Sequence, residues 1–81
     1  MTTKIWRVVF DGNYSKRIVA AKSVAEAVEI ATALFKRDTD EYVSDAKKEG
    51  QKRDDYDTWE DIVENGHADP TSIDLVEESE N

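Results

Sequence analysis

The sequence has no cysteine, one proline, one histidine and three glycines among its 81 residues. Without cysteine, a disulfide framework and any thiolate metal site are excluded. No apolar run approaches the roughly 18 residues that a membrane span needs. Residues 1–5 also lack the long apolar stretch of a signal peptide. These absences predict a cytoplasmic protein with no membrane partner.

Positive charge is scarce in the second half of the chain. The net charge is −8. Residues 1–37 carry seven Lys/Arg and three Asp/Glu, residues 38–64 carry four Lys/Arg and eleven Asp/Glu, and residues 65–81 carry five Asp/Glu and no Lys/Arg. Phosphate backbones repel a protein of this charge, which argues against direct nucleic-acid binding. A basic protein surface is the expected partner.

The first strongly patterned segment, residues 4–21, predicts a β-hairpin. In residues 4–10 (KIWRVVF), aromatic and β-branched side chains alternate onto one face, as in a strand. Asp11-Gly12-Asn13 is a turn signal because glycine and asparagine tolerate positive φ. Strand character then resumes up to Ala21.

Residues 23–37 predict the main helix. Ser23 and Glu26 fit a capping box, and Lys36 and Arg37 in the last turn suit the helix dipole. Six apolar side chains follow the cap on a 3.6-residue period and form one stripe: Val24, Ala27, Val28, Ala31, Leu34 and Phe35.

Residues 38–57 predict an acidic, partly helical segment. Thr39 fits the N-cap of a second helix that runs to about Glu49, with Gly50 ending it. The apolar face of that helix is thin, so a mobile segment is the alternative interpretation.

The rest of the chain predicts a short helix and a last strand. Thr58 fits the N-cap of a helix over residues 58–65, with Asp61 at its third position. Residues 72–76 alternate as a strand, and residues 77–81 are expected to fray.

Together these elements predict a single α+β domain over residues 1–81. Its three-stranded antiparallel sheet has the order 2-1-3, because a right-handed crossover returns the last strand to the side of the first. One main helix and one or two short helices cover one face, and Ile5, Arg7 and Val9 lie on the bare face. The expected core is Trp6, Val8, Phe10, Ile18, Val28, Ala31, Leu34, Phe35, Ile73 and Leu75, with Trp59 at its margin.

The sequence offers no convergent set of catalytic or metal-ligating residues. His67 stands alone and is expected to be a solvated loop residue. The acids from Asp38 to Glu49 are spaced like a calcium loop, but Val43 stands where such a loop needs glycine. No glycine-rich phosphate-binding motif occurs. We therefore expect no catalytic residue, no metal and no cofactor, and a protein that is not an enzyme.

Aromatic residues lie among the acids of residues 38–64. Solubility alone explains a run of acids, but tyrosine ringed by charge is also typical of binding surfaces. Trp59 is expected to belong to the core instead. The predicted partner-binding residues, facing a basic protein surface, are Asp54, Asp55, Tyr56, Asp57, Glu60 and Asp61.

Residues 6–35 resemble a pattern found in small phage-encoded proteins, in which a hairpin runs into A-x-[ST]-x-x-E-A-x-E-[IL]-A; here the motif spans residues 21–31. The phage T7 inhibitor of host RNA polymerase is similar in its layout of hairpin, capped helix and final strand. That inhibitor has no counterpart of the acidic middle segment, so no functional residue is transferred. The resemblance implies a phage or prophage origin and modulation of a host protein.

Three functions compete at this point. The first is a small acidic phage-type protein that binds and inhibits or modulates a host nucleic-acid-handling protein, acting as a nucleic-acid mimic. The alternative is a structural or assembly module that oligomerises through its sheet. The third, a metal-dependent hydrolase built on the acidic cluster, has the least support because its carboxylates show no ligand spacing.

Overall fold

The computed structural model describes residues 2–80 and the side chains of residues 3–78. None of the helices in this part of the chain combines the length and the apolar character of a membrane span. The elements in chain order are β1 (Thr2–Phe10), the 3₁₀ turn η1 (Asp11–Asn13), β2 (Ser15–Ala21), α1 (Val24–Lys48), the 3₁₀ turn η2 (Arg53–Asp55), α2 (Trp59–Glu64) and β3 (Pro70–Glu80).

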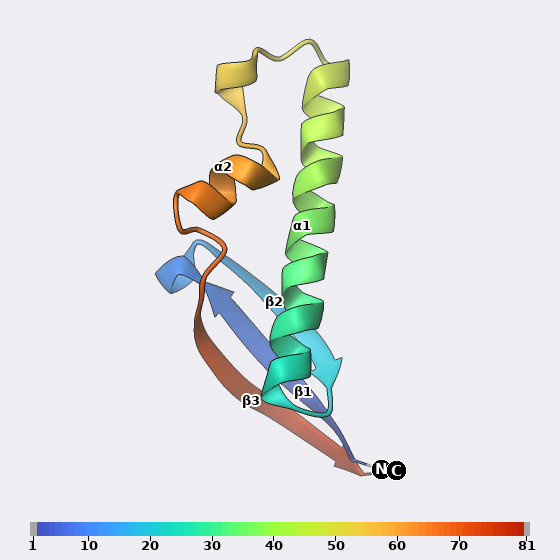
Figure 1. Cartoon of the computed structure of the whole chain (residues 1–81). Coiled ribbons are helices and arrows are strands. Elements are labelled where there is room, and N and C mark those ends of the chain that lie inside the picture. Colours follow the sequence, from blue (N-terminus) through green and yellow to red (C-terminus); the bar gives the residue numbers. More distant parts are fainter. Residues whose placement is uncertain (1, 81) are drawn as a thin grey trace.

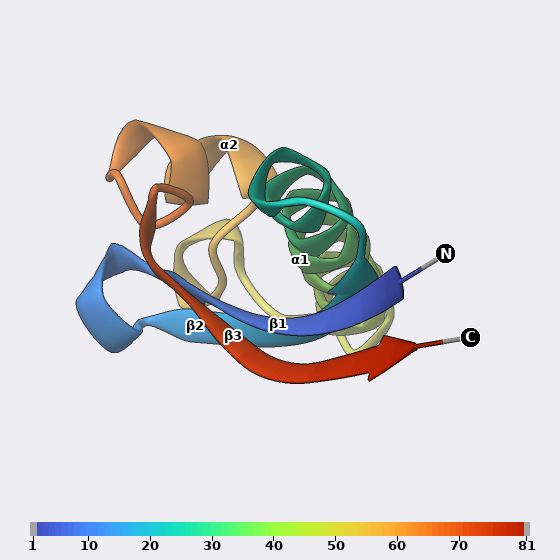
Figure 2. The same cartoon turned by 90° about the horizontal axis from the view of Figure 1, so that it is seen from below.

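The sheet confirms the predicted α+β fold. Its order is β2-β1-β3 and both pairings are antiparallel. Trp6 at the centre of β1 lies opposite Val19 on β2 and Leu75 on β3. Both helices cover the same face of the sheet, and the other face is open (Figure 2). Ile5, Arg7 and Val9 alternate with the core residues of β1 and thus lie on the open face, as expected.

The hairpin turn is tied to the loop before β3. Asp11 and Gly12 both adopt positive φ, 48° and 72°, which lets the chain reverse within η1. The Asp11 amide donates to the Asp69 carbonyl at 2.9 Å, and the Gly12 amide donates to the Thr71 hydroxyl at 2.9 Å. These bonds fix the end of the sheet from which the candidate site is built.

Alternate residues of the sheet pack under α1 to form the core. Phe10 and Phe35 lie 5.0 Å apart between ring centroids, and Phe35 meets Trp59 edge-on at 5.1 Å. The Trp6 indole Nε1 donates to the Ala21 carbonyl at 3.1 Å, so its polar group is satisfied. The buried cluster is Trp6, Val8, Phe10, Val19, Ala21, Ala27, Ala31, Phe35 and Ile62, with Ile30, Leu34, Trp59, Ala68 and Ile73 packed against it.

Three expected core residues lie outside the core. Val28 is half-buried and is not part of the buried cluster or of the side chains packed against it. Ile18 is 56% exposed because β2 turns Val19, and not Ile18, toward the helix. Leu75 is 49% exposed although it pairs with the buried Trp6. The cause is the position of α1, which packs mainly over β2 and leaves the outer strand β3 largely uncovered.

The second helix predicted after Thr39 is wrong, because α1 runs unbroken to Lys48. Thr39 is buried inside the helix, and its hydroxyl donates to the Phe35 carbonyl at 2.9 Å instead of capping a new one. An ion pair between Lys36 and Asp40, with an N–O distance of 2.8 Å, links the predicted main helix to the segment predicted as a second helix. The far half of α1 extends past the sheet (Figure 1).

The predicted caps are largely confirmed, but the predicted end of the main helix at Arg37 is wrong, because α1 continues to Lys48 and has Lys47 and Lys48 in its last turn. Ser23 accepts from the Glu26 amide at 3.2 Å, although Glu26 accepts from the Lys22 amide and not from that of the cap residue. Gly50, with φ 79°, ends α1 in a Schellman motif. Thr58 caps α2 in a complete capping box.

The last strand is longer than predicted. β3 spans Pro70–Glu80, and Glu77 to Glu80 pair with Ile5 to Thr2. Residues 77–80 thus pair with β1 beyond the predicted end of the strand at Val76, because β1 begins early enough to satisfy their backbone groups. Residue 81 lies outside the described residues.

Candidate functional site

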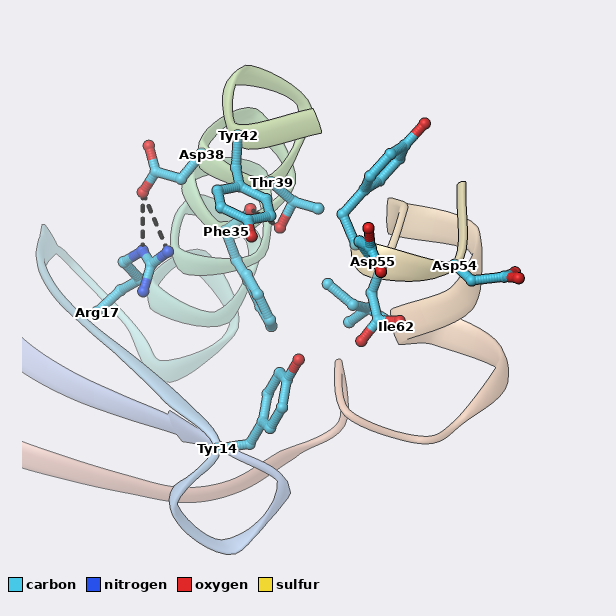
Figure 3. Close-up of a pocket in the computed structure, with 11 residues that line it drawn as sticks. Tyr14, Arg17, Phe35, Asp38, Thr39, Tyr42, Asp54, Asp55 and Ile62 are labelled. Carbon is cyan, nitrogen blue, oxygen red and sulfur yellow. Dashed lines mark hydrogen bonds and ion pairs between the residues drawn. The ribbon is translucent and has the colours of Figure 1, made fainter. Parts of the chain in front are cut away.

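A cleft of about 560 Å³ opens where the far half of α1, the end of the hairpin and the segment around η2 meet. In Figure 3 the labelled side chains come from all three parts and surround one open space. The lining residues are Tyr14, Arg17, Phe35, Asp38, Thr39, Tyr42, Asp54, Asp55, Tyr56, Asp57 and Ile62. Aromatic rings and carboxylates thus dominate its walls.

Two exposed tyrosines stand at the sides of the cleft, over a buried floor. Phe35 and Ile62 are core residues, whereas Tyr14 is 47% and Tyr42 56% exposed. Tyr42 is one turn beyond Asp38 and Thr39 on α1, so the helix presents all three to the cleft. The Tyr42 ring and the exposed part of the Tyr14 ring are accessible to a partner.

His67 holds Tyr14 in place. The two rings stack with centroids 4.1 Å apart and planes 9° from parallel. The His67 Nδ1 lies 2.6 Å from a carboxylate oxygen of Asp11. His67 is therefore not the solvated loop residue expected from the sequence, and its side chain is 29% exposed. It is a positioning residue for one wall of the cleft.

Arg17 and Asp38 form a closed pair at one end. The Arg17 Nε and Nη2 both reach one Asp38 oxygen, at 3.2 and 3.0 Å. The same guanidinium lies 5.3 Å above the Phe35 ring centroid. Asp38 also pairs with Arg37 at 3.3 Å. The charge at this end is balanced within the chain.

The opposite end carries unbalanced negative charge. Asp54, Asp55 and Asp57 are exposed, and among the side chains of residues 3–78 their carboxylates make no ion pair and no hydrogen bond. Their backbone is nevertheless ordered by η2, in which the Asp55 amide donates to the Lys52 carbonyl at 2.9 Å. Arg53 adds a hydrogen bond to the Tyr56 carbonyl at 3.2 Å.

Asp61 is engaged inside the chain. Its carboxylate accepts from the Thr58 amide and hydroxyl, both at 3.1 Å, and pairs with Arg53 at 2.8 Å. The amide hydrogen bond, followed by the Arg53 guanidinium, holds the pKa of Asp61 below its usual range. The same carboxylate raises the pKa of Arg53. Asp61 therefore positions the segment that carries the unpaired acids.

Tyr56 is buried, with 8% of its surface exposed. The main core cluster does not include it; Thr39 and Ala46 of α1 are the other buried residues outside that cluster. An exposed anchor was expected from the sequence, because residues 51–57 read as a polar connector. Tyr56 is instead a large buried side chain that lines the cleft together with Thr39 and Tyr42 of α1.

Glu60 belongs to a different hollow. A second space of about 620 Å³ lies on another side of α1, where basic and acidic residues alternate. Its lining residues are Lys36, Asp40, Val43, Ser44, Lys47, Arg53, Thr58, Trp59 and Glu60. The structure thus brings Asp54, Asp55, Tyr56 and Asp57 together in one cleft and separates Glu60 and Asp61 from it.

Sequence reasoning missed Tyr14, Arg17, Asp38 and Tyr42 as parts of the site. Tyr42 was identified among the acids, but its partner residues lie far away in the chain. No local signal links Arg17 to Asp38, because the two meet only when α1 crosses β2. Predicting one continuous helix through residue 42 would have placed Asp38 and Tyr42 on the same helix face and so indicated that both belong to one site.

Carboxylates and aromatic rings are the groups that the cleft presents. Among the described side chains, no three histidine, aspartate or glutamate residues converge to hold a metal ion. Comparison with protein-family models, with curated proteins and with solved structures finds no match for this chain.

Proposed function

We propose that this protein is a small acidic interaction protein that binds a basic surface of another protein through the cleft. The observation that carries the proposal is the unpaired charge of Asp54, Asp55 and Asp57, held on an ordered turn beside two exposed tyrosines. Unpaired carboxylates on a rigid support attract a basic partner and speed its association.

The proposed target is a nucleic-acid-handling protein of a host cell, which the chain inhibits or modulates. Such proteins carry basic surfaces that bind phosphate backbones, and a row of carboxylates imitates that charge. The resemblance of residues 6–35 to small phage-encoded proteins supports the host-directed role. The −8 net charge opposes direct binding to nucleic acid itself.

The test begins with affinity capture from a bacterial lysate, with mass spectrometry to identify the partner. Reversing Asp54, Asp55 and Asp57 to lysine should then slow association with that partner and flatten its salt dependence. Charge steering weakens as the Debye length falls from about 10 Å at 0.1 M salt to about 3 Å at 1 M. Equal association rates for the reversed and original proteins across this range would contradict the proposal.

A second candidate function is assembly through the open face of the sheet. Ile18 is 56% exposed there, and Ile5 and Val9 lie half-buried beside it on β1. Apolar side chains on an uncovered sheet face are typical of contact surfaces. Sedimentation of the isolated protein distinguishes the two: a stable oligomer that Ile18→Lys dissociates would favour assembly.

A further inference from the structure

The chain itself contains two examples of how its aromatic rings and carboxylates hold a guanidinium. Arg17 lies 5.3 Å above the Phe35 ring and pairs with Asp38 at 3.0 Å. Arg53 lies 5.6 Å from the Tyr56 ring centroid and pairs with Asp61 at 2.8 Å. In both, a flat cation covers a ring while its N–H groups reach a carboxylate.

Beyond Arg17, which Phe35 and Asp38 already hold at one end, the cleft offers the same kinds of groups a second time. Tyr42 and Tyr14 offer exposed rings, and Asp54, Asp55 and Asp57 offer carboxylates with no ion pair in the described chain. The space between them, about 560 Å³, falls in the range of clefts that enclose a ligand group. Arg17 is the one cation among the described lining residues and it is engaged by Asp38, so these exposed rings and unpaired carboxylates are open to a guanidinium from outside.

We propose that the cleft is a receptor for an arginine side chain of the partner. This inference rests on the proposed function and names the group that the acidic surface recognises. Arginine fits better than lysine for two reasons. Its planar guanidinium stacks on a tyrosine ring, and its fork of N–H donors reaches several carboxylate oxygens at once. The ammonium of lysine is a compact charge that stays strongly hydrated.

The expected partner segment is thus exposed and arginine-rich, with at least one side chain long enough to reach past the rim. The buried floor of Phe35 and Ile62 excludes water beneath the bound group. Ion pairs are stronger where water is excluded. In this proposal Asp54, Asp55 and Asp57 attract the basic segment, and the two tyrosine rings favour a guanidinium over an ammonium group.

The test uses two fluorescein-labelled nonapeptides of equal charge, one alternating arginine with glycine and the other alternating lysine with glycine. Fluorescence anisotropy measures their dissociation constants from the full-length protein at low and at physiological salt. We expect the arginine peptide to bind about three- to tenfold more tightly than the lysine peptide, as stacking of a guanidinium on tyrosine provides.

Variants of Tyr42 separate the contribution of ring stacking to peptide binding from the contribution of charge. Tyr42→Phe keeps the ring and should preserve the preference for arginine. Tyr42→Leu removes the ring, keeps a shorter apolar side chain, and should weaken the arginine peptide about two- to fivefold with little change for lysine. Because Tyr42 is 56% exposed, both variants should fold, and circular dichroism checks that they do.

The acids are tested against a control of equal charge change. Replacing Asp54, Asp55 and Asp57 by asparagine should weaken both peptides about tenfold at low salt. The control replaces three exposed helix acids outside the cleft with their amides: Glu29, Asp45 and Glu64. This control variant should weaken the binding of both peptides clearly less than the replacement of Asp54, Asp55 and Asp57.

The outcomes distinguish the acidic binding surface of the proposed function from the arginine receptor proposed here. If the asparagine variant binds no more weakly than the control, net charge alone attracts the peptides, and both the proposed surface and the receptor are wrong. If the asparagine variant is weakened but arginine and lysine bind equally and Tyr42→Leu has no effect, the acidic surface stands and the arginine receptor is overturned. Failure of both peptides to bind the original protein also overturns the receptor.

Discussion

Replacing Tyr56 by alanine should destabilise the protein far more than replacing Tyr42. A buried aromatic side chain removes about 150–250 Å² from water, which is worth about 4–6 kcal/mol at about 25 cal/mol per Å². An extended-chain reference overstates such areas by about 10–40%. We therefore expect Tyr56→Ala to lower the free energy of unfolding by about 2–5 kcal/mol, in line with other large-to-small replacements.

This loss is large for a chain of this size, whose total stability is about 4–12 kcal/mol. Tyr42 is 56% exposed, against 8% for Tyr56, so Tyr42→Ala should cost less than about 1 kcal/mol. Tyr56→Phe should also be mild, since the tyrosine hydroxyl makes no hydrogen bond within the described chain.

The assay is urea unfolding followed by two signals. Circular dichroism reports all of α1, whereas the fluorescence of Trp6 and Trp59 reports the main core. If Tyr56 holds the extension of α1, Tyr56→Ala should lose helix signal at lower urea than the fluorescence change. Equal midpoints for Tyr56→Ala and Tyr42→Ala would refute the assignment of Tyr56 as a buried packing residue.

Three further predictions concern the caps and the metal chemistry. The lowered pKa of Asp61 means that its carboxylate stabilises the fold above about pH 4, and that this contribution is lost as the pH falls through the folded pKa. Asp61→Asn should therefore flatten the fall in thermal midpoint as the pH is lowered below about 4. Ser23→Ala removes the cap of α1 and should cost about 1 kcal/mol, seen as a midpoint about 4–8 °C lower. Millimolar calcium, magnesium or zinc should leave the midpoint unchanged; a rise of about 10 °C would reveal a bound ion.

Local patterns in the sequence are enough to predict most of the fold. The alternation through Trp6, Val8 and Phe10 gives the core face of β1, and Ser23 and Thr58 mark two helix starts correctly. Such signals work because capping and side-chain alternation depend on residues close together in the chain. The order 2-1-3 follows from the handedness of the crossover.

The features that could not be predicted from the sequence depend on contacts between residues far apart in the chain. Ile18 and Val19 are both good strand formers, and only the position of α1 decides which is buried. Tyr56 stands in a polar connector, and its burial depends on the extension of α1 beside it. The same holds for the cleft, whose tyrosines come from positions 14 and 42 and whose unpaired acids come from positions 54–57.

The continuity of α1 through Thr39 is the feature on which the cleft depends, and Asp40→Pro tests it. If Thr39 capped a separate helix, Asp40 would be the first helical residue, where proline is favoured. In an unbroken helix, proline at position 40 removes the hydrogen bond to the carbonyl of residue 36 and clashes with it, at a cost of about 3 kcal/mol or more. Asp40→Ala is the matched control, because it also loses the exposed ion pair with Lys36 yet keeps the backbone amide, and should cost less than about 0.5 kcal/mol. Urea unfolding compares the two variants. Equal stabilities would mean that the helix breaks at Thr39, and Tyr42 would then no longer be held beside the acids of residues 54–57.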